Sequence, residues 1–285
     1  MTGVRQVETT AELRRLVDAW PDPSSIGFVP TMGALHAGHE QLIRQARGEC
    51  DHVVVSIFVN PLQFDRAEDL ERYPRTLAAD IDTCGRLGVD LVFAPSVHEM
   101  YPIRPACAVD PGPLATHLCG AFRPGHFRGV ATVVLKLLNM VGAGRAYFGE
   151  KDAQQLAIVR QMVRDFDVPV TIIGVPTVRE PDGLALSSRN MRMNVEERTL
   201  APRLYQALRA ARDLIASGST DARAVKEAAA TTIGTHELLQ LEYLEIVDPQ
   251  DMQPVAVIAG PVVIAGALWV GQTRLIDNCL AAPSA

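Results

Sequence analysis

The chain of 285 residues lacks the features that mark membrane and secreted proteins. Its longest apolar stretch, residues 255–270, is interrupted by Gly260, Pro261 and Gly266 and is too short for a membrane-spanning helix. The first residues contain no apolar segment of the kind found in a secretory signal peptide. We therefore expect a chain that has no membrane partner.

The chain has few cysteines, and its basic residues are outnumbered by its acidic residues. The five cysteines, at positions 50, 84, 107, 119 and 279, form no Cys-x-x-Cys pair. An odd, scattered set is typical of reduced thiols in the cytoplasm rather than of a disulfide framework. The formal net charge of −6 disfavours a nucleic-acid partner for the chain as a whole.

Two common nucleotide-binding motifs and the usual enzyme nucleophiles are also missing. The sequence contains neither a Gly-x-x-x-x-Gly-Lys-[Ser/Thr] loop nor a Gly-x-Gly-x-x-Gly motif. No Ser-His-Asp or Cys-His order stands out, and no pair of carboxylates suggests a glycosidase. These absences exclude P-loop transfer and a standard dinucleotide site from the expected functions.

Apolar runs alternate with helical patterns through the first two thirds of the chain. Near-continuous apolar runs indicate parallel strands that are covered on both faces. This alternation predicts an α/β fold built on a doubly wound parallel sheet, with ligands beyond the carboxyl ends of the strands. The expected strands are residues 27–30, 52–59, 89–94, 146–148 and 170–175, and the expected helices are 38–48, 77–87, 129–141 and 153–166.

The pattern changes after residue 177. Residues 195–217 and 221–232 have helical spacing, and residues 241–247, 254–258 and 262–270 resemble short strands. We therefore expect two domains, residues 1–177 and a smaller C-terminal α+β domain of residues 178–285, which we expect to cover the nucleotide.

The most informative local pattern is His36-Ala37-Gly38-His39, which follows an apolar run and a Pro/Gly turn and opens a predicted helix. A helix start offers free N–H groups and a positive dipole end, and glycine lets the backbone approach phosphates. Two histidines three residues apart share one helix face and can donate to phosphoryl oxygens. The alternatives are a chance pair on a solvated face, or a metal pair with His126 as a third ligand.

Further polar residues follow the later strands. Asn60 and Gln63 carry amides suited to the hydroxyls and carboxylate of a small ligand, although Asn-Pro also makes an ordinary turn. Lys151 opposes the dipole of the helix it precedes, which indicates an anion site unless a neighbouring acid pairs with it. The loop at residues 187–189, Ser-Ser-Arg, could clamp a triphosphate, although such loops are common.

Taken in order, five blocks of the chain resemble the pantothenate synthetase (pantoate–β-alanine ligase) family. The blocks are residues 30–39, 58–64, 73–76, 147–155 and 186–190, with a looser match at 273–278. The resemblance implies a Rossmann-like nucleotidylyltransferase fold related to class I aminoacyl-tRNA synthetases. It also implies a cytoplasmic homodimer that uses Mg²⁺-ATP.

The reaction that the resemblance implies has two steps. The carboxylate of pantoate attacks the α-phosphate of ATP, which gives pantoyl adenylate and pyrophosphate. The amine of β-alanine then attacks the adenylate, which gives pantothenate and AMP. Because adenylation supplies the leaving group, no enzyme nucleophile is required, and catalysis depends on positioning and charge stabilisation.

The resemblance also assigns roles to individual residues. The catalytic residues, which also bind ATP, are His36, His39, Lys151, Ser187, Ser188 and Arg189. The remaining ATP contacts are Pro30, Met32, Gly149, Asp152 and Val178, and the pantoate contacts are Asn60, Gln63 and Gln155. Many relatives carry two adjacent acids where this chain has Ala79-Asp80, so Asp80 alone is the expected Mg²⁺ ligand.

Two other functions compete with this interpretation. One is a different small-molecule nucleotidylyltransferase, against which the amides of Asn60, Gln63 and Gln155 favour a hydroxy-acid partner. The other is a non-catalytic, nucleotide-binding regulator. A regulator is expected to have lost His39, Lys151 or Arg189, and all three are present.

Overall fold

A computed structural model describes residues 3–283, which divide into two compact units. The first unit takes the chain up to Pro111 together with Arg123–Glu150 and Ile158–Pro176. The second takes Gly112–Phe122, Lys151–Ala157 and the chain from Thr177 onward. Two short segments that precede residue 158 thus belong with the C-terminal residues, and a simple division at residue 177 stays a prediction.

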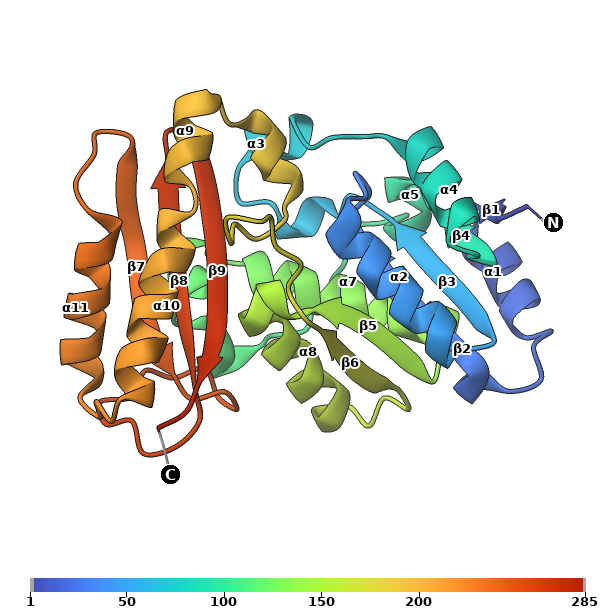
Figure 1. The fold of residues 1–285 in the computed structure, drawn as a ribbon. Coiled ribbons are helices and arrows are strands. Elements are labelled where there is room, and N and C mark those ends of the chain that lie inside the picture. The colour runs from blue at the N-terminus through green and yellow to red at the C-terminus, as the bar shows by residue number, and fades with distance from the viewer. Residues whose placement is uncertain (1–2, 284–285) are drawn as a thin grey trace. The chain divides into compact units, whose positions relative to one another are not determined.

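The first unit is built on a six-stranded parallel sheet (Figure 1). Its strands are β1 (Arg5–Val7), β2 (Ile26–Thr31), β3 (His52–Ile57), β4 (Leu91–Phe93), β5 (Arg145–Gly149) and β6 (Thr171–Val175). Their order in the sheet is β1-β4-β3-β2-β5-β6. The chain runs from β2 through β3 to β4 toward one edge of the sheet and from β5 to β6 toward the other, so the strand order reverses between the neighbouring strands β2 and β5. Ligands of doubly wound sheets bind beyond the carboxyl ends of the strands at such a reversal. The predicted α/β fold class is confirmed.

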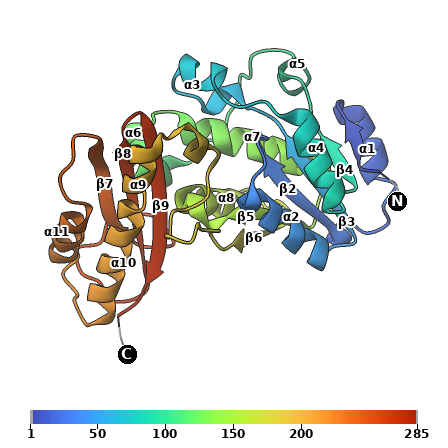
Figure 2. The same ribbon diagram turned by 45° about the horizontal axis from the view of Figure 1, so that its top comes forward.

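Helices cover both faces of this sheet. Figure 1 and Figure 2 show α2 (Ala37–Glu49) and α4 (Leu77–Arg86) on one face, as right-handed crossovers from β2 and β3 require. On that face Ile43 and Cys84 pack against Val55, and all three are inaccessible to solvent. The other helices that complete this unit are α1 (Thr10–Val17), α3 (Ala67–Glu71), α5 (Val97–Met100), α7 (His126–Val141) and most of α8 (Ala153–Asp165).

The second unit is a three-stranded antiparallel sheet with helices against it. Its strands, β7 (Leu239–Val247), β8 (Val262–Val270) and β9 (Thr273–Ala281), lie in that order. Three helices precede the sheet in the chain: α9 (Val195–Leu200), α10 (Arg203–Ala216) and α11 (Ala222–Ile233). A fourth helix of this unit, α6 (Cys119–Phe122), lies in the segment Gly112–Phe122. The expected α+β character is confirmed.

Some predicted elements of the second unit were wrong. Residues 254–258 form no strand and make only isolated bridges, Val247 with Pro254 and Asp221 with Val257. The third strand is β9, which the sequence did not indicate. The helix expected at residues 195–217 is two helices, because the ring of Pro202 clashes with the preceding helical turn and lacks the amide hydrogen that would continue it.

No helix among residues 3–283 combines the length and the apolarity that crossing a bilayer demands.

Candidate active site

The turn after β2 leads directly into the two histidines. Gly33 and Ala34 both have positive φ, +82° and 51°, a conformation that is uncommon for alanine. The hydroxyl of Thr31 fixes the start of the turn: it donates to the carbonyl of Ser56 at 2.8 Å and accepts from the amide of Gly33 at 3.2 Å. The chain is thereby bent so that His36 becomes the N-cap of α2.

Asp80 holds the other side of this turn. Its carboxylate, on α4 and only 2% exposed, accepts from the amide of Ala34 at 3.0 Å and from that of Leu35 at 2.8 Å. The hydroxyl of Thr76 donates to it at 3.1 Å. Both carboxylate oxygens are therefore used by the protein, which gives Asp80 a structural role; its role as a Mg²⁺ ligand stays a prediction.

His36 and His39 form a capping box made of two imidazoles. Nδ1 of His36 accepts from the amide of Gly38 at 3.1 Å, and Nδ1 of His39 accepts from the amide of His36 at 3.4 Å. A main-chain amide only donates, so each neutral ring carries its proton on Nε2. A Cβ at Gly38 would lie 2.9 Å from the His36 ring, which explains the glycine between the histidines. The arrangement presents two oriented Nε2–H donors at a helix start.

The metal alternative for these histidines finds no third ligand. His126 is engaged elsewhere, with Nδ1 at 2.8 Å from the carbonyl of Gln63 and Nε2 at 3.2 Å from Arg123. Within residues 3–283, no group of three or more His, Cys, Asp or Glu side chains could hold an ion.

Asn60 and Gln63 meet beyond the end of β3. Asn60 is 1% exposed and donates through Nδ2 to Oε1 of Gln63 at 3.0 Å and to the carbonyl of Gly129 at 3.2 Å. The Nε2 of Gln63 lies 3.1 Å from the sulfur of Met32. The structure therefore brings together three of the predicted residues of the first unit.

Pro30 and Gly149 lie on neighbouring strands. Pro30 is in β2, which pairs with β5, and Gly149 is the last residue of β5. A Cβ at Gly149 would meet nothing within 4 Å. Both residues lie toward the carboxyl ends of the strands at the reversal point of the sheet, where a nucleotide is expected.

In the second unit, Lys151, Asp152 and Gln155 lie around the start of α8. The main chain there is fixed because Asn278 of β9 donates to the carbonyl of Lys151 at 2.9 Å. Gln154, which lies in the block of residues 147–155 but was given no role, donates to the carbonyls of Leu114 at 2.8 Å and His117 at 2.7 Å. No hydrogen bond or ion pair joins the ammonium of Lys151 to any side chain between residues 3 and 283, so the neighbouring acids do not pair with it.

Val178 and residues 187–189 belong to one anchored loop. The amide of Leu186 donates to the carbonyl of Val178 at 3.0 Å, and the hydroxyl of Ser187 accepts from the amide of Arg189 at 3.3 Å. Arg179 fixes the loop to β9 by an ion pair with Asp277, with 2.6 Å between Nη1 and Oδ2. Ser188 and Arg189 lie in the short helix η5 (Ser188–Arg192).

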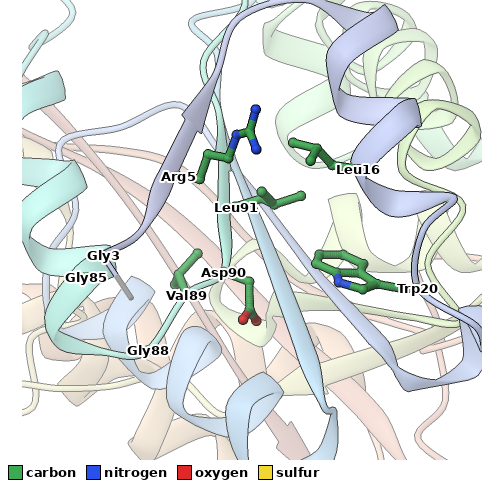
Figure 3. Close-up of a pocket in the computed structure, with 9 residues that line it drawn as sticks. All are labelled: Gly3, Arg5, Leu16, Trp20, Gly85, Gly88, Val89, Asp90 and Leu91. Atoms are coloured by element: carbon green, nitrogen blue, oxygen red, sulfur yellow. The ribbon is translucent and has the colours of Figure 1, made fainter. Parts of the chain in front are cut away.

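A pocket elsewhere in the first unit contains none of the predicted residues (Figure 3). Arg5 of β1, Trp20 and Asp90, which precedes β4, are among the residues that line it. It lies toward the amino ends of the parallel strands, opposite the edge where ligands are expected. Its charged groups are already paired, Arg5 with Glu12 at 2.6 Å and Asp90 with Arg47 at 2.9 Å. We do not assign a ligand to it.

Comparison with known proteins gives the family. The family model for pantoate-beta-alanine ligase matches residues 5–280. The chain belongs to this family.

Relatives of this ligase family align along nearly the whole chain. A bifunctional pantoate ligase/cytidylate kinase of Thermosynechococcus vestitus is 54% identical over 98% of this chain and 55% of its own length. A pantothenate synthetase of Fervidobacterium nodosum is 51% identical over 97% of this chain and 99% of its own. The chain thus spans about half the length of the bifunctional relatives it matches and the full length of others.

Solved structures of this ligase family share the fold. Pantothenate synthetase of Thermus thermophilus superposes with a TM-score of 0.91 at 48% identity, covering 97% of this chain and 99% of the other. Pantoate-beta-alanine ligase of Francisella tularensis, crystallised with beta-gamma ATP and β-alanine, superposes with a TM-score of 0.81 at 35% identity. That comparison covers 98% of each chain.

Proposed function

We propose that the chain catalyses the ATP-dependent condensation of pantoate with β-alanine through a pantoyl adenylate. The observation that carries this proposal is the pair of oriented Nε2–H donors at the start of α2, in a chain of the pantoate–β-alanine ligase family. The Francisella tularensis relative, crystallised with beta-gamma ATP and β-alanine, supports these two molecules as substrates.

In the first step, a carboxylate oxygen of pantoate bonds to the α-phosphorus of ATP, and the bond from that phosphorus to the bridging oxygen of pyrophosphate breaks. Charge then builds on the phosphoryl oxygens. His36 and His39 donate to those oxygens, and Lys151 and Arg189 neutralise their charge, because fixed donors stabilise the transition state without reorganising. Ser187 and Ser188 add hydroxyl donors. Pro30, Met32, Gly149, Asp152 and Val178 contact the rest of the nucleotide.

In the second step, the neutral amine of β-alanine attacks the acyl carbon of the adenylate. The bond from that carbon to the phosphate oxygen breaks, AMP leaves and the new amide nitrogen loses a proton to solvent. Gln63 and Gln155 hold pantoate through both steps, and Asn60, whose amide is fully engaged within the protein, holds Gln63 in place. Because the adenylate is already activated, positioning of the two reactants supplies the remaining rate enhancement.

The residues around Asp80 do not fit a resident Mg²⁺ ion. Both oxygens of this carboxylate already accept hydrogen bonds from the protein, and no cluster of metal-ligating side chains occurs in residues 3–283. Mg²⁺ is commonly held by substrate phosphates and water with few protein carboxylates. We propose that the ion arrives as part of the nucleotide substrate.

The decisive experiment is AMP release by purified protein with Mg²⁺-ATP and pantoate, with and without β-alanine. AMP that requires both co-substrates, with pantothenate found by mass spectrometry, is the expected result. Pyrophosphate without an amide product would identify a nucleotidylyltransferase with another partner. Tight ATP binding without turnover would identify a regulator. Light scattering of the same sample tests the homodimer, and fractionation of cells tests the cytoplasmic location.

A further inference from the structure

Tyr101 lies outside every motif considered so far and contacts the candidate pantoate site. It directly follows α5, and its hydroxyl donates to Oδ1 of Asn60 at 2.9 Å. Burial raises the pKa of Tyr101 to about 12, so the hydroxyl keeps its proton near neutral pH. A phenol in this state is available as a permanent donor.

The contacts of Asn60 leave only one orientation for its amide. Oδ1 accepts from the amide of Leu62 at 3.3 Å as well as from Tyr101, while Nδ2 donates to the carbonyl of Gly129. A main-chain amide only donates and a carbonyl only accepts, so the amide of Asn60 is held by groups of fixed polarity at both ends. All of its hydrogen-bonding positions are used within the protein, since an amide has two donors and two acceptor lone pairs.

The orientation of Asn60 sets the orientation of Gln63. Nδ2 of Asn60 takes Oε1 of Gln63, so the NH₂ group of Gln63 points away from Asn60, where its one protein contact within residues 3–283 is the weakly accepting sulfur of Met32. Gln63 therefore presents donors rather than an acceptor to a ligand. Donors match the carboxylate and hydroxyl oxygens of a 2-hydroxy acid.

The ring of Tyr101 is itself held from two sides. Phe58 packs at 6.0 Å between ring centroids, and the ammonium of Lys136 lies 5.4 Å from the centre of the Tyr101 ring. Lys136 also donates to the carbonyl of Met100, the residue before Tyr101. These contacts fix the ring by groups other than the hydroxyl, so removing the hydroxyl alone leaves the packing in place.

We propose that Tyr101 is a positioning residue that acts through Asn60 to turn the donor side of Gln63 toward the hydroxy-acid substrate. The inference rests on the proposed function, since it concerns the same substrate. Tyr101 touches neither reactant in this account. It determines how strongly the substrate is bound and leaves the chemistry on the phosphate unchanged.

The test is Tyr101→Phe, compared with Tyr147→Phe as a matched control. Tyr147 lies in the same unit and also loses a buried hydroxyl, which donates to Glu49 at the far end of α2 at 3.0 Å. For Tyr101→Phe we expect the KM for pantoate to rise about three- to tenfold, the worth of one neutral hydrogen bond. The KM for ATP and kcat should stay within about twofold. Tyr147→Phe should leave the KM for pantoate unchanged.

A second background shows whether Tyr101 acts through Gln63. In Gln63→Ala, adding Tyr101→Phe should raise the KM for pantoate no further, because the group that it orients is gone. An equal increase in both backgrounds would overturn the proposal, as would a lower melting temperature with an unchanged KM for pantoate. If wild type makes no pantothenate, the proposed function fails; if wild type is active and Tyr101→Phe behaves like it, only this inference fails.

Discussion

The two units hold their predicted site residues in opposite ways. In the first, the polar groups are satisfied by one another and by the backbone: His36 and His39 cap a helix, and Asn60 orients Gln63. In the second, the backbone around Lys151 and Arg189 is anchored, but their cationic groups have no side-chain partner within residues 3–283. The first unit therefore supplies oriented neutral donors, and the second supplies positive charge.

The difference follows from the cost of each group. A buried amide without a partner loses its hydration, so Asn60, which is 1% exposed, is stable only when the protein satisfies it. Lys151 and Arg189 are half-buried and remain in contact with water, so they tolerate the lack of a protein partner. Neutral donors can be fixed before a ligand arrives, whereas unpaired cations are best matched by an anion such as a triphosphate.

Removing a fixed donor of the first unit should have the largest effect. We expect His39→Ala to lower the rate of pyrophosphate release about 10²- to 10³-fold, the usual cost of losing one transition-state donor. Stopped-flow pyrophosphate detection measures it. His98→Ala, an exposed histidine on α5, is the control and should leave the rate unchanged. Full activity in His39→Ala would remove the basis for the phosphate-donor role.

Removing a cation of the second unit should separate activity from stability. We expect Lys151→Ala to lower the adenylation rate about 10²-fold, because the charge that neutralises the phosphates is gone. The melting temperature should stay equal or rise, because the lysine opposes the dipole of α8 and has no ion pair to lose. Lys226→Ala, which breaks an ion pair with Glu245, should lower the melting temperature and leave the adenylation rate unchanged. A Lys151→Ala variant that is both active and destabilised would contradict the comparison.

Breaking the turn of the first unit should affect folding as well as rate. Asp80→Asn replaces one accepting oxygen with an NH₂ group that faces an amide or hydroxyl donor, so we expect a loss of about 1–3 kcal/mol in the free energy of unfolding. Urea denaturation measures it, with the exposed Asp82→Asn on the same helix as control. The Mg²⁺ concentration for half-maximal residual activity should not change. A tenfold increase in that concentration would make Asp80 a metal ligand after all.

A structural element could be predicted from the sequence where the residues that determine it are close together in the chain. Five of the six parallel strands were predicted because each contains an apolar run, and the start of α2 because the His-x-Gly-His pattern carries its own cap. The three-residue edge strand β1, Arg-Gln-Val, was not predicted because it has no such run. Strand β9 was not predicted, since Arg274, Asp277 and Asn278 interrupt its apolar pattern. Asp277 is 5% exposed there only because Arg179, far away in the sequence, pairs with it.

In the candidate site, too, contacts between residues distant in sequence could not be predicted. The resemblance gave Asn60 and Gln63, but the hydroxyl that donates to Asn60 comes from Tyr101, which is 41 residues away and has no motif around it. The turn geometry likewise depends on Asp80, which reaches the amides of Ala34 and Leu35 from another helix. Local patterns indicated the residue types of the site. The contacts that orient them are made by residues distant in sequence.

Thiol labelling compares the two units with the least perturbation. Burial raises the pKa of Cys84 in the first unit to about 12 and that of Cys279 in the second to about 11, while Cys107 is exposed. Because the thiolate is the reactive form, Cys107 should react first with iodoacetamide, then Cys279 and last Cys84. Below its raised pKa, labelling of Cys279 should accelerate about tenfold per pH unit, without a plateau near the usual thiol pKa of about 8.5. Mass spectrometry of the digested protein reads each site. Labelling of Cys84 as fast as that of Cys107 would show that the core beneath the histidine turn opens readily, and the fixed-donor account of the first unit would then be wrong.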